Sequence, residues 1–313
     1  MIEVLKASPF LTVQDAGRTG GRSRGIPRSG AMDLPALRTA NLIVGNRGGA
    51  AGFEWALGPM VLRFGEAAMI AAGGALVDLT LDGAAVPAWT AITVRAGSEL
   101  RLSVPRSGRF SYLAVAGGLA VPEVFGSRST YLPGRFGGLD GRLIRTGDQL
   151  PVQGAGSFDA RIRERLPEQL TPGAGLVRVL PGPQDRFFDD PVWQALASGE
   201  YRVGRAADRM GYRLEGPTVS HRGPAALPSE AACSGAIQIP QGGAPIVVMN
   251  DGPTVGGYPK IGVIIGPDLG RFAQLSPGDR AALTRVDLAT ALEASRQELG
   301  RLEEIRGWVI RSR

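Results

Sequence analysis

Short apolar runs, each closed by turn residues, are the feature that most constrains how this chain can fold. Residues 75 to 83 (ALVDLTLDG), 91 to 104 (AITVRAGSELRLSV) and 244 to 252 (APIVVMNDG) are typical. Runs of this length, bounded by Gly, Pro, Asp and Asn, indicate strands and tight turns. The 46 glycines and 23 prolines among 313 residues extend the pattern along the chain. The sequence therefore predicts a mainly β fold of closed or sandwich type, with a few short helices and less helix than the usual third or so.

Three segments carry the signals of a helix. Residues 33 to 44 and 190 to 198 each begin with Asp, have Pro in the first turn and are followed by Gly. Residues 287 to 306 place apolar side chains at helical spacing, namely Leu288, Leu292, Leu299, Leu302 and Ile305. We expect this terminal helix to dock on the core, and a further short helix around residues 160 to 166.

A weak internal repeat predicts the domain organisation. FEWALGP (53 to 59) is similar to YRLEGP (212 to 217), and RTGDQL (145 to 150) is similar to LSPGDR (275 to 280), in the same order. Chance matches among Gly, Pro and Asp are the alternative. The repeat predicts two related β domains, residues 1 to 155 and 176 to 313, the second with a C-terminal helix. Residues 156 to 175, rich in charge, Pro and Gly, would form the linker.

Composition excludes several function classes. With one cysteine (Cys233) and one histidine (His221), an internal disulfide, a Cys/His zinc site and a histidine-based triad lack the residues they need. Acid-base chemistry then falls to Asp, Glu, Lys or Tyr. The formal charge of +6 comes from arginines spread along the chain without a basic block, so we expect no nucleic-acid partner. No apolar stretch reaches the ~18 residues of a membrane helix, and we expect a cytoplasmic protein.

Two glycine-rich segments of the first half could receive an anion. Residues 12 to 33 contain Gln14, Asp15 and Arg18 among flexible glycines, and residues 114 to 142 place Ser127 beside Arg128. Glycines let backbone N–H groups converge on a ligand, and arginine adds charge-assisted hydrogen bonds to phosphate or carboxylate. Ordinary surface loops held by their own side chains are the alternative.

The segment NDGPTVGGYPKIG, residues 250 to 262, is the sharpest candidate for a site. It places Lys260, one of only two lysines, near a Gly-Gly turn, a tyrosine and a carboxylate. Lysine is a compact charge whose pKa shifts when it is desolvated, which suits phosphate neutralisation or proton transfer. An exposed loop lysine is the alternative. Neither lysine follows Gly, so the chain has no P-loop.

These segments resemble a known family. TVQDAGRTGG, GAMD, ANLIVGN, AVAGGLAVPEVFGSRSTY, GRFGGLDGR, RVLPGPQ, DRMGYRLEG, GAIQIP and GGYPK stand in the order found in the KipA family, also called allophanate hydrolase subunit 2 or the biotin-dependent carboxyltransferase domain. Members often have two threonines before GGY, whereas this chain has Pro253, Thr254 and Val255. The missing hydroxyl bears on substrate specificity.

The resemblance implies a pair of cyclophilin-like β-barrel domains and obligate partners. Bacterial members are usually assigned to ATP-dependent 5-oxoprolinase. There a KipI-type B subunit would act with this chain, using ATP with Mg²⁺ and no tightly bound cofactor, to phosphorylate 5-oxo-L-proline. An A subunit of LamB/YcsF type would help open the ring to L-glutamate. The alternatives are a biotin-dependent carboxyltransferase component acting on urea, and a regulatory antagonist that binds KipI.

For either chemistry, the site hypothesis assigns roles residue by residue. Lys260 would be the electrostatic stabiliser, and Asp251 a base or metal partner. Tyr258 and Thr254 would hydrogen-bond the substrate, while Gly256 and Gly257 would allow close backbone approach. A second group would line the opposite side: Gln14, Asp15, Arg18, Ser127 and Arg128.

Overall fold

The structure is a computed structural model that describes residues 1–153, 165–170, 175–224 and 226–311. Strands take 33% of the chain and helices 20%, which confirms a mainly β fold with a minor helical share. The chain divides into two compact units, and each is described by itself. Unit 1 comprises Met1–Arg18, Ser29–Pro172 and Leu299–Arg313, and unit 2 comprises Thr19–Arg28 and Gly173–Glu298.

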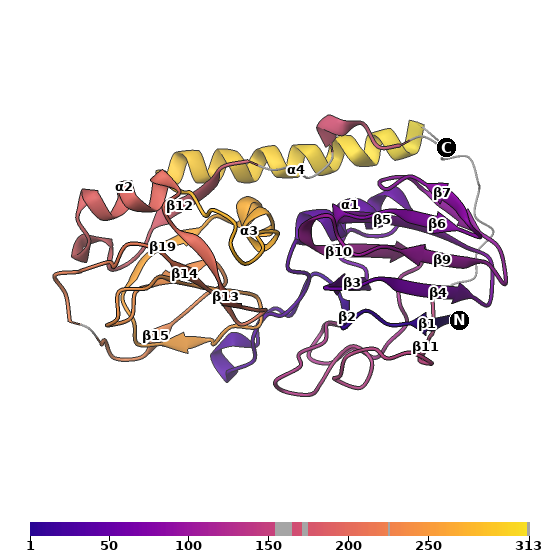
Figure 1. The fold of residues 1–313 in the computed structure, drawn as a ribbon, viewed down its shortest axis with the longest axis horizontal. Helices are drawn as coiled ribbons and strands as arrows, with labels where there is room; N and C mark the ends of the chain where they lie inside the picture. The colour runs from indigo at the N-terminus through magenta and orange to yellow at the C-terminus, as the bar shows by residue number, and fades with distance from the viewer. Residues whose placement is uncertain (154–164, 171–174, 225, 312–313) are drawn as a thin grey trace. The chain divides into compact units, whose positions relative to one another are not determined.

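Unit 1 is built from two antiparallel sheets (Figure 1). In sheet order, the larger contains β11 (Gln149–Leu150), β1 (Ile2–Lys6), β4 (Met60–Phe64), β9 (Glu99–Leu102), β6 (Leu79–Leu81) and β7 (Ala84–Val86). The other contains β2 (Phe10–Gln14), β3 (Gly52–Ala56), β10 (Ser107–Val115), β5 (Ala68–Leu76) and β8 (Ile92–Val94). Both sheets share one core, because Val4 and Leu62 of the first cluster with Phe53 and Leu113 of the second.

Unit 2 is built on one seven-stranded sheet. In sheet order, its strands are β13 (Arg202–Ala207), β14 (Gly211–Glu215), β17 (Ile246–Val248), β16 (Ala236–Gln238), β19 (Lys260–Ile264), β12 (Val177–Pro181) and β20 (Leu283–Arg285). A separate pair joins β15 (Glu230–Ala231) to β18 (Val255–Gly256). Only β12 and β20 run parallel among the strand pairs of the described residues.

The repeated RTGDQL and LSPGDR segments form the same turn in both units. In unit 1 the amide of Val4 donates to the carbonyl of Asp148 at 2.9 Å, and Gly147 donates back to Val4 at 2.8 Å. In unit 2 Val203 makes the matching pair of hydrogen bonds with Asp279 (2.9 Å) and Gly278 (2.8 Å). Both glycines have φ above +90°, a backbone conformation that glycine adopts without steric cost. The repeat therefore reflects a local structure that occurs twice.

The expected helices occur, and one was not foreseen. These helices are α1 (Leu34–Ile43), α2 (Asp190–Ser198), α3 (Gly266–Ala273) and α4 (Leu288–Arg311), together with the 3-10 turns η1 (Arg22–Arg24), η2 (Glu168–Leu170) and η3 (Asp185–Phe187). Asp33 caps α1 by accepting from the amide of Ala36 at 3.1 Å, and Gly199 ends α2 in the left-handed conformation. The unforeseen helix is α3. The short helix expected around 160–166 falls largely outside the described residues.

The C-terminal helix differs from expectation in which face it buries. Leu302 and Ile305 are buried, but Leu288, Leu292 and Leu299 are 59%, 48% and 61% exposed. The prediction of a single docked stripe was wrong for these three, because the first turns of α4 instead bury Ala291 and Ala294 against Ile265, and only the last turns bury Leu302 and Ile305. Those turns group with unit 1, so residues 299–313, like 19–28, fall in a different unit from the expected ranges.

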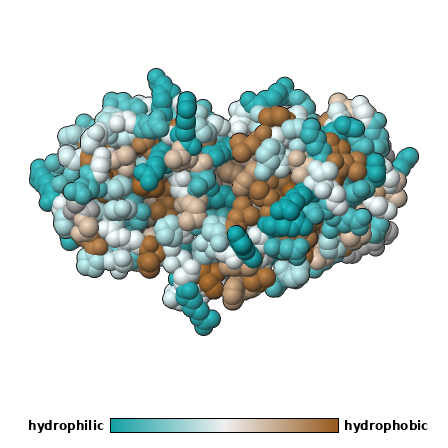
Figure 2. Space-filling model, turned by 60° about the horizontal axis from the view of Figure 1, so that its bottom comes forward, coloured by the Kyte–Doolittle hydropathy of each residue, from teal (hydrophilic) through white to brown (hydrophobic). Residues whose placement is uncertain are grey.

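The surface carries apolar side chains between its polar ones. On the face drawn in Figure 2, hydrophobic patches interrupt the hydrophilic surface. Large apolar side chains are exposed at several turns, among them Phe125 (60%), Val255 (57%) and Tyr258 (43%). Over the described residues, no helix is long and apolar enough to cross a membrane.

Candidate functional site

Lys260 is a buried strand residue. It is the first residue of β19 and 4% exposed, so the alternative of an exposed loop lysine is wrong. The strand resumes directly after the GGYP turn, where β19 pairs with β16 and brings Gln238 opposite Lys260. A buried ammonium group needs a carboxylate or several hydrogen-bond acceptors to offset its desolvation. The surroundings of Lys260 supply them.

Glu230 and Gln184 hold the lysine. Lys260 Nζ lies 2.5 Å from Glu230 Oε1, and the same oxygen accepts from Gln184 Nε2 at 2.8 Å. Gln184 Oε1 in turn accepts from the backbone amide of Lys260 at 3.0 Å. The hydrogen bond from Lys260 lowers the pKa of the Glu230 carboxyl, and the hydrogen bond from Gln184 adds a smaller lowering effect. Glu230 is 39% exposed on its side chain, so this ionised pair meets solvent at the carboxylate end.

Two glycines keep the backbone close to this network. Gly256 pairs with Glu230 across β15 and β18, and a Cβ at Gly256 would lie 2.6 Å from Gln238 Nε2. A Cβ at Gly257 would lie 2.7 Å from the carbonyl oxygen of Leu227. Gln238 is 5% exposed, and its Nε2 has no hydrogen-bond partner within the described part of the chain. A buried amide donor without a partner is unusual and marks a place where a ligand oxygen could be bound.

The other candidate residues of the 250–262 segment differ in burial and in their partners. Asp251, expected beside Lys260 as a base or metal partner, makes a bidentate ion pair with Arg209 at 2.7 and 3.1 Å, and both side chains are about 95% buried or more. Thr254 is 9% exposed and its carbonyl accepts from Ala232 at 3.0 Å. Tyr258 lies on the surface. The segment thus contributes Lys260 to one ion pair and Asp251 to a separate one.

In unit 1, Asp15 is the centre of a second cluster. Its Oδ1 accepts from Gly17 N at 2.8 Å, from Ser127 Oγ at 2.6 Å and from the Ser129 hydroxyl, and its Oδ2 accepts from Arg128 N at 2.6 Å. Asp15 is 9% exposed, and its carboxylate accepts one local hydrogen bond, from Gly17, and three from residues 127–129. The structure therefore brings Asp15, Ser127 and Arg128 together as expected, but their polar groups bind one another and neighbouring groups of unit 1.

Gln14, Arg18 and Arg128 complete the unit 1 cluster. Gln14 donates to Thr130 O at 3.2 Å, and Arg18 donates to Val124 O at 3.1 Å and stacks on Phe136 at 4.7 Å. The Arg128 side chain donates to Val121 O at 2.9 Å and pairs with Glu123 at 2.5 Å. These side chains fix the loop that follows β10. They belong to unit 1 and Lys260 belongs to unit 2, so whether they line an opposite wall stays a prediction.

No metal site accompanies either cluster within the described ranges, where no group of three or more His, Cys, Asp or Glu side chains could hold an ion. Around Lys260 the one close carboxylate, Glu230, is already paired with the lysine. This surrounding does not fit a Mg²⁺ ligand set on its own. We therefore assign no chemical step to a metal bound by this chain.

Comparison with known proteins identifies the family. The family model for the carboxyltransferase domain, subdomain A and B, matches residues 24–285. The chain belongs to this carboxyltransferase family. The chain is 39% identical to the C subunit of 5-oxoprolinase from Escherichia coli, with 98% of each chain covered. It is 34% identical to the C subunit of 5-oxoprolinase from Haemophilus influenzae, again over 98% of each.

Fungal relatives contain a similar region within longer proteins. A putative urea carboxylase of Emericella nidulans is 33% identical over 96% of this chain but only 25% of its own length. The crystal structure of the Kluyveromyces lactis urea carboxylase superposes with a TM-score of 0.88 at 29% identity, covering 97% of this chain and 29% of that one. The fold and the predicted family are thereby confirmed.

Proposed function

We propose that this chain is the C subunit of an ATP-dependent 5-oxoprolinase. The observation that carries the proposal is its similarity to the C subunit of the E. coli 5-oxoprolinase over nearly the whole of both chains. In this proposal a KipI-type B subunit and this chain use ATP with Mg²⁺ to phosphorylate the lactam carbonyl oxygen of 5-oxo-L-proline. A LamB/YcsF-type A subunit then helps water to open the activated ring, which gives L-glutamate and releases phosphate.

The network around Lys260 offers the groups that a lactam needs. A lactam presents one carbonyl oxygen and one N–H group. Lys260 Nζ and Gln238 Nε2, which has no partner among the described residues, are donors for the oxygen, and the Glu230 carboxylate, whose pKa Lys260 lowers, is an acceptor for the N–H. Preorganised donors of this kind stabilise charge that develops on a carbonyl or phosphoryl oxygen. Thr254 and Tyr258 remain proposed substrate contacts, since they border the same turn.

The remaining predicted residues are assigned supporting roles. The buried ion pair with Arg209 leaves Asp251 poorly placed to act as a base, so we assign it to shaping the turn before Gly256 and Gly257. In unit 1, the hydrogen bonds of Asp15 favour a role in holding the loop of Ser127 and Arg128. Glu230 takes the acid-base position first expected for Asp251.

An omission experiment tests the proposal. This chain, the B subunit and the A subunit would be purified and mixed with ATP, Mg²⁺ and 5-oxo-L-proline, and ADP and L-glutamate would be measured. We expect ADP release that requires 5-oxoproline and falls to background when either this chain or the B subunit is left out. ADP release that is indifferent to 5-oxoproline in the complete mixture would refute the proposal.

A carboxyltransferase acting on urea is the second candidate, and the TM-score of 0.88 to the K. lactis urea carboxylase favours it. This chain covers only 29% of that protein, so such an activity would need further components. Transfer of labelled carboxyl from carboxybiotin to urea, stimulated by this chain, would support the second candidate over the first.

A further inference from the structure

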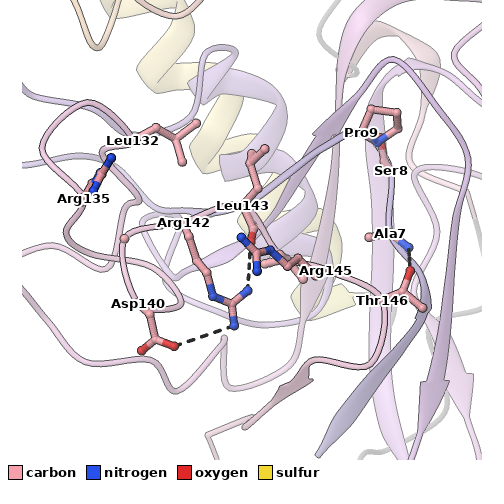
Figure 3. A pocket seen from close by; sticks show the side chains of 12 residues that line it. Ala7, Ser8, Pro9, Leu132, Arg135, Asp140, Arg142, Leu143, Arg145 and Thr146 are labelled. Carbon is pink, nitrogen blue, oxygen red and sulfur yellow. Dashed lines mark hydrogen bonds and ion pairs between the residues drawn. The ribbon is translucent and has the colours of Figure 1, made fainter.

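Unit 1 contains a pocket that neither the family comparisons nor the Lys260 network explains. Its volume is about 640 Å³, within the range of small-molecule sites. The connection between β1 and β2 (residues 7–9) forms one wall, and residues 132–146 form the other (Figure 3). All of its lining residues belong to unit 1.

The pocket is positively charged. Arg135, Arg142 and Arg145 line it together with Asp140, and Arg142 is also paired with Asp148 next to the pocket, so three guanidinium groups face two carboxylates and one net positive charge remains. Arg142 is held in place by a bidentate ion pair with Asp148 at 2.6 and 3.0 Å, and this hydrogen bonding lowers the pKa of the Asp148 carboxyl. Among the described residues the guanidinium groups of Arg135 and Arg145 make no hydrogen bond or close ion pair, although the charge of Arg145 also helps to lower the pKa of the Asp148 carboxyl.

The loop that carries these arginines is fixed by its own packing. A Cβ at Gly137 would overlap the carbonyl oxygen of Ser129, and one at Gly138 would overlap the hydroxyl of Thr130. Arg135 and Asp140 themselves have φ of 53° and 56°, in the left-handed region that costs energy for residues other than glycine. Such a backbone persists only where its surroundings determine it, so the arginines are presented from a preorganised loop.

The geometry points to a binding site for the phosphate groups of a small molecule. Guanidinium groups match phosphate oxygens in bidentate geometry, and a phosphate group carries about −1.5 to −2 charges and three acceptor oxygens, which suits a pocket lined by several arginines. The apolar side chains of Leu132 and Leu143, on the same walls, suit an organic portion attached to the phosphate. The inference does not depend on the proposed function, because it concerns binding by this chain alone.

Isothermal titration of the full chain at low ionic strength tests the site, with metal-free pyrophosphate as the probe. Arg135→Gln/Arg145→Gln removes the charges of the two arginines without a hydrogen-bonded side-chain partner among the described residues and retains most of the side-chain length. Arg95→Gln, at an exposed position of the same unit outside the pocket, is the matched control. We expect saturable binding that weakens by about tenfold or more in the double variant and by less than about twofold in the control.

Further titrations identify the source of the phosphate. Tighter binding of ADP than of pyrophosphate would show that the organic portion contributes, and equal binding would show that the phosphates alone are recognised. Three results would overturn the inference: no saturable binding by the wild-type chain, unchanged binding by a double variant with an unaltered circular dichroism spectrum, or citrate binding as tightly as pyrophosphate.

Discussion

Removing Lys260 and removing Glu230 should lower the free energy of unfolding by different amounts. Lys260→Met keeps most of the side-chain volume but removes the ammonium group, and Glu230, 39% exposed, can then be hydrated. Glu230→Ala instead leaves the ammonium group of Lys260, on a side chain that is 5% exposed, without its carboxylate partner. We therefore expect Lys260→Met to lower the free energy of unfolding by about 1–2 kcal/mol and Glu230→Ala by about 3 kcal/mol or more.

The double variant and the pH dependence sharpen this prediction. Lys260→Met/Glu230→Ala should lose less than the sum of the single losses, with a coupling of about 1–3 kcal/mol. Because the folded-state pKa of Glu230 is lowered, the stability it contributes is present above its unfolded pKa near ~4.3 and lost as the pH falls through the lowered value. The difference between wild type and Lys260→Met should therefore shrink below about pH 4.

Urea unfolding followed by circular dichroism measures these changes, and hydrogen exchange of the peptide covering 255–264 assigns them to unit 2. Lys6→Met, which changes the exposed second lysine, is the matched control and should shift stability by less than ~0.5 kcal/mol. A larger loss in Lys260→Met than in Glu230→Ala, additive single losses, or a difference independent of pH would refute the reasoning.

Three further predictions concern the supporting residues and the complex. Asp15→Asn should lower the free energy of unfolding by about 3 kcal/mol, because it removes a carboxylate that accepts from four donors. Asp140→Asn is the control and should be nearly neutral, so equal shifts of the melting temperature would contradict this prediction. Asp251→Asn should lower the free energy of unfolding by about 3–5 kcal/mol, because it removes the carboxylate that pairs with the buried Arg209. An unchanged midpoint of urea unfolding would contradict the pairing. The isolated chain should hydrolyse little or no ATP with 5-oxoproline present, because the proposed reaction needs the B subunit. A substantial rate that is unchanged by adding the B subunit would contradict this dependence.

Local sequence signals predicted much of the fold. Strands, capped helices and the Gly-Asp turns depend on residues a few positions apart, so their signals are visible in the sequence. The turn at Gly147 and its counterpart at Gly278 are the clearest case, because both need the same left-handed glycine. The buried faces of α4 were not predictable in this way, since periodicity shows that a stripe exists but not how much of it the core reaches.

The candidate site was predicted only in part, because its contacts are distant in the sequence. Lys260 stood out by its rarity, but its partners Glu230, Gln184 and Gln238 have no local signal. Glu230 lies 30 residues away and Gln184 lies 76 residues away, and sheet pairing brings them together. Asp251 was adjacent in sequence to the same turn, yet its carboxylate pairs with Arg209, 42 residues away.

The most direct test of the account is the turnover of the reconstituted complex carrying Lys260→Met, beside the same complex carrying Lys6→Met. If Lys260 stabilises developing charge, 5-oxoproline-dependent ATP hydrolysis should fall by about 100-fold or more with Lys260→Met and stay near wild type with Lys6→Met. Lys260→Arg should restore little, because the guanidinium is larger and planar. Near-wild-type turnover of the Lys260→Met complex, with the B subunit still bound, would contradict the central claim that this lysine serves the chemistry.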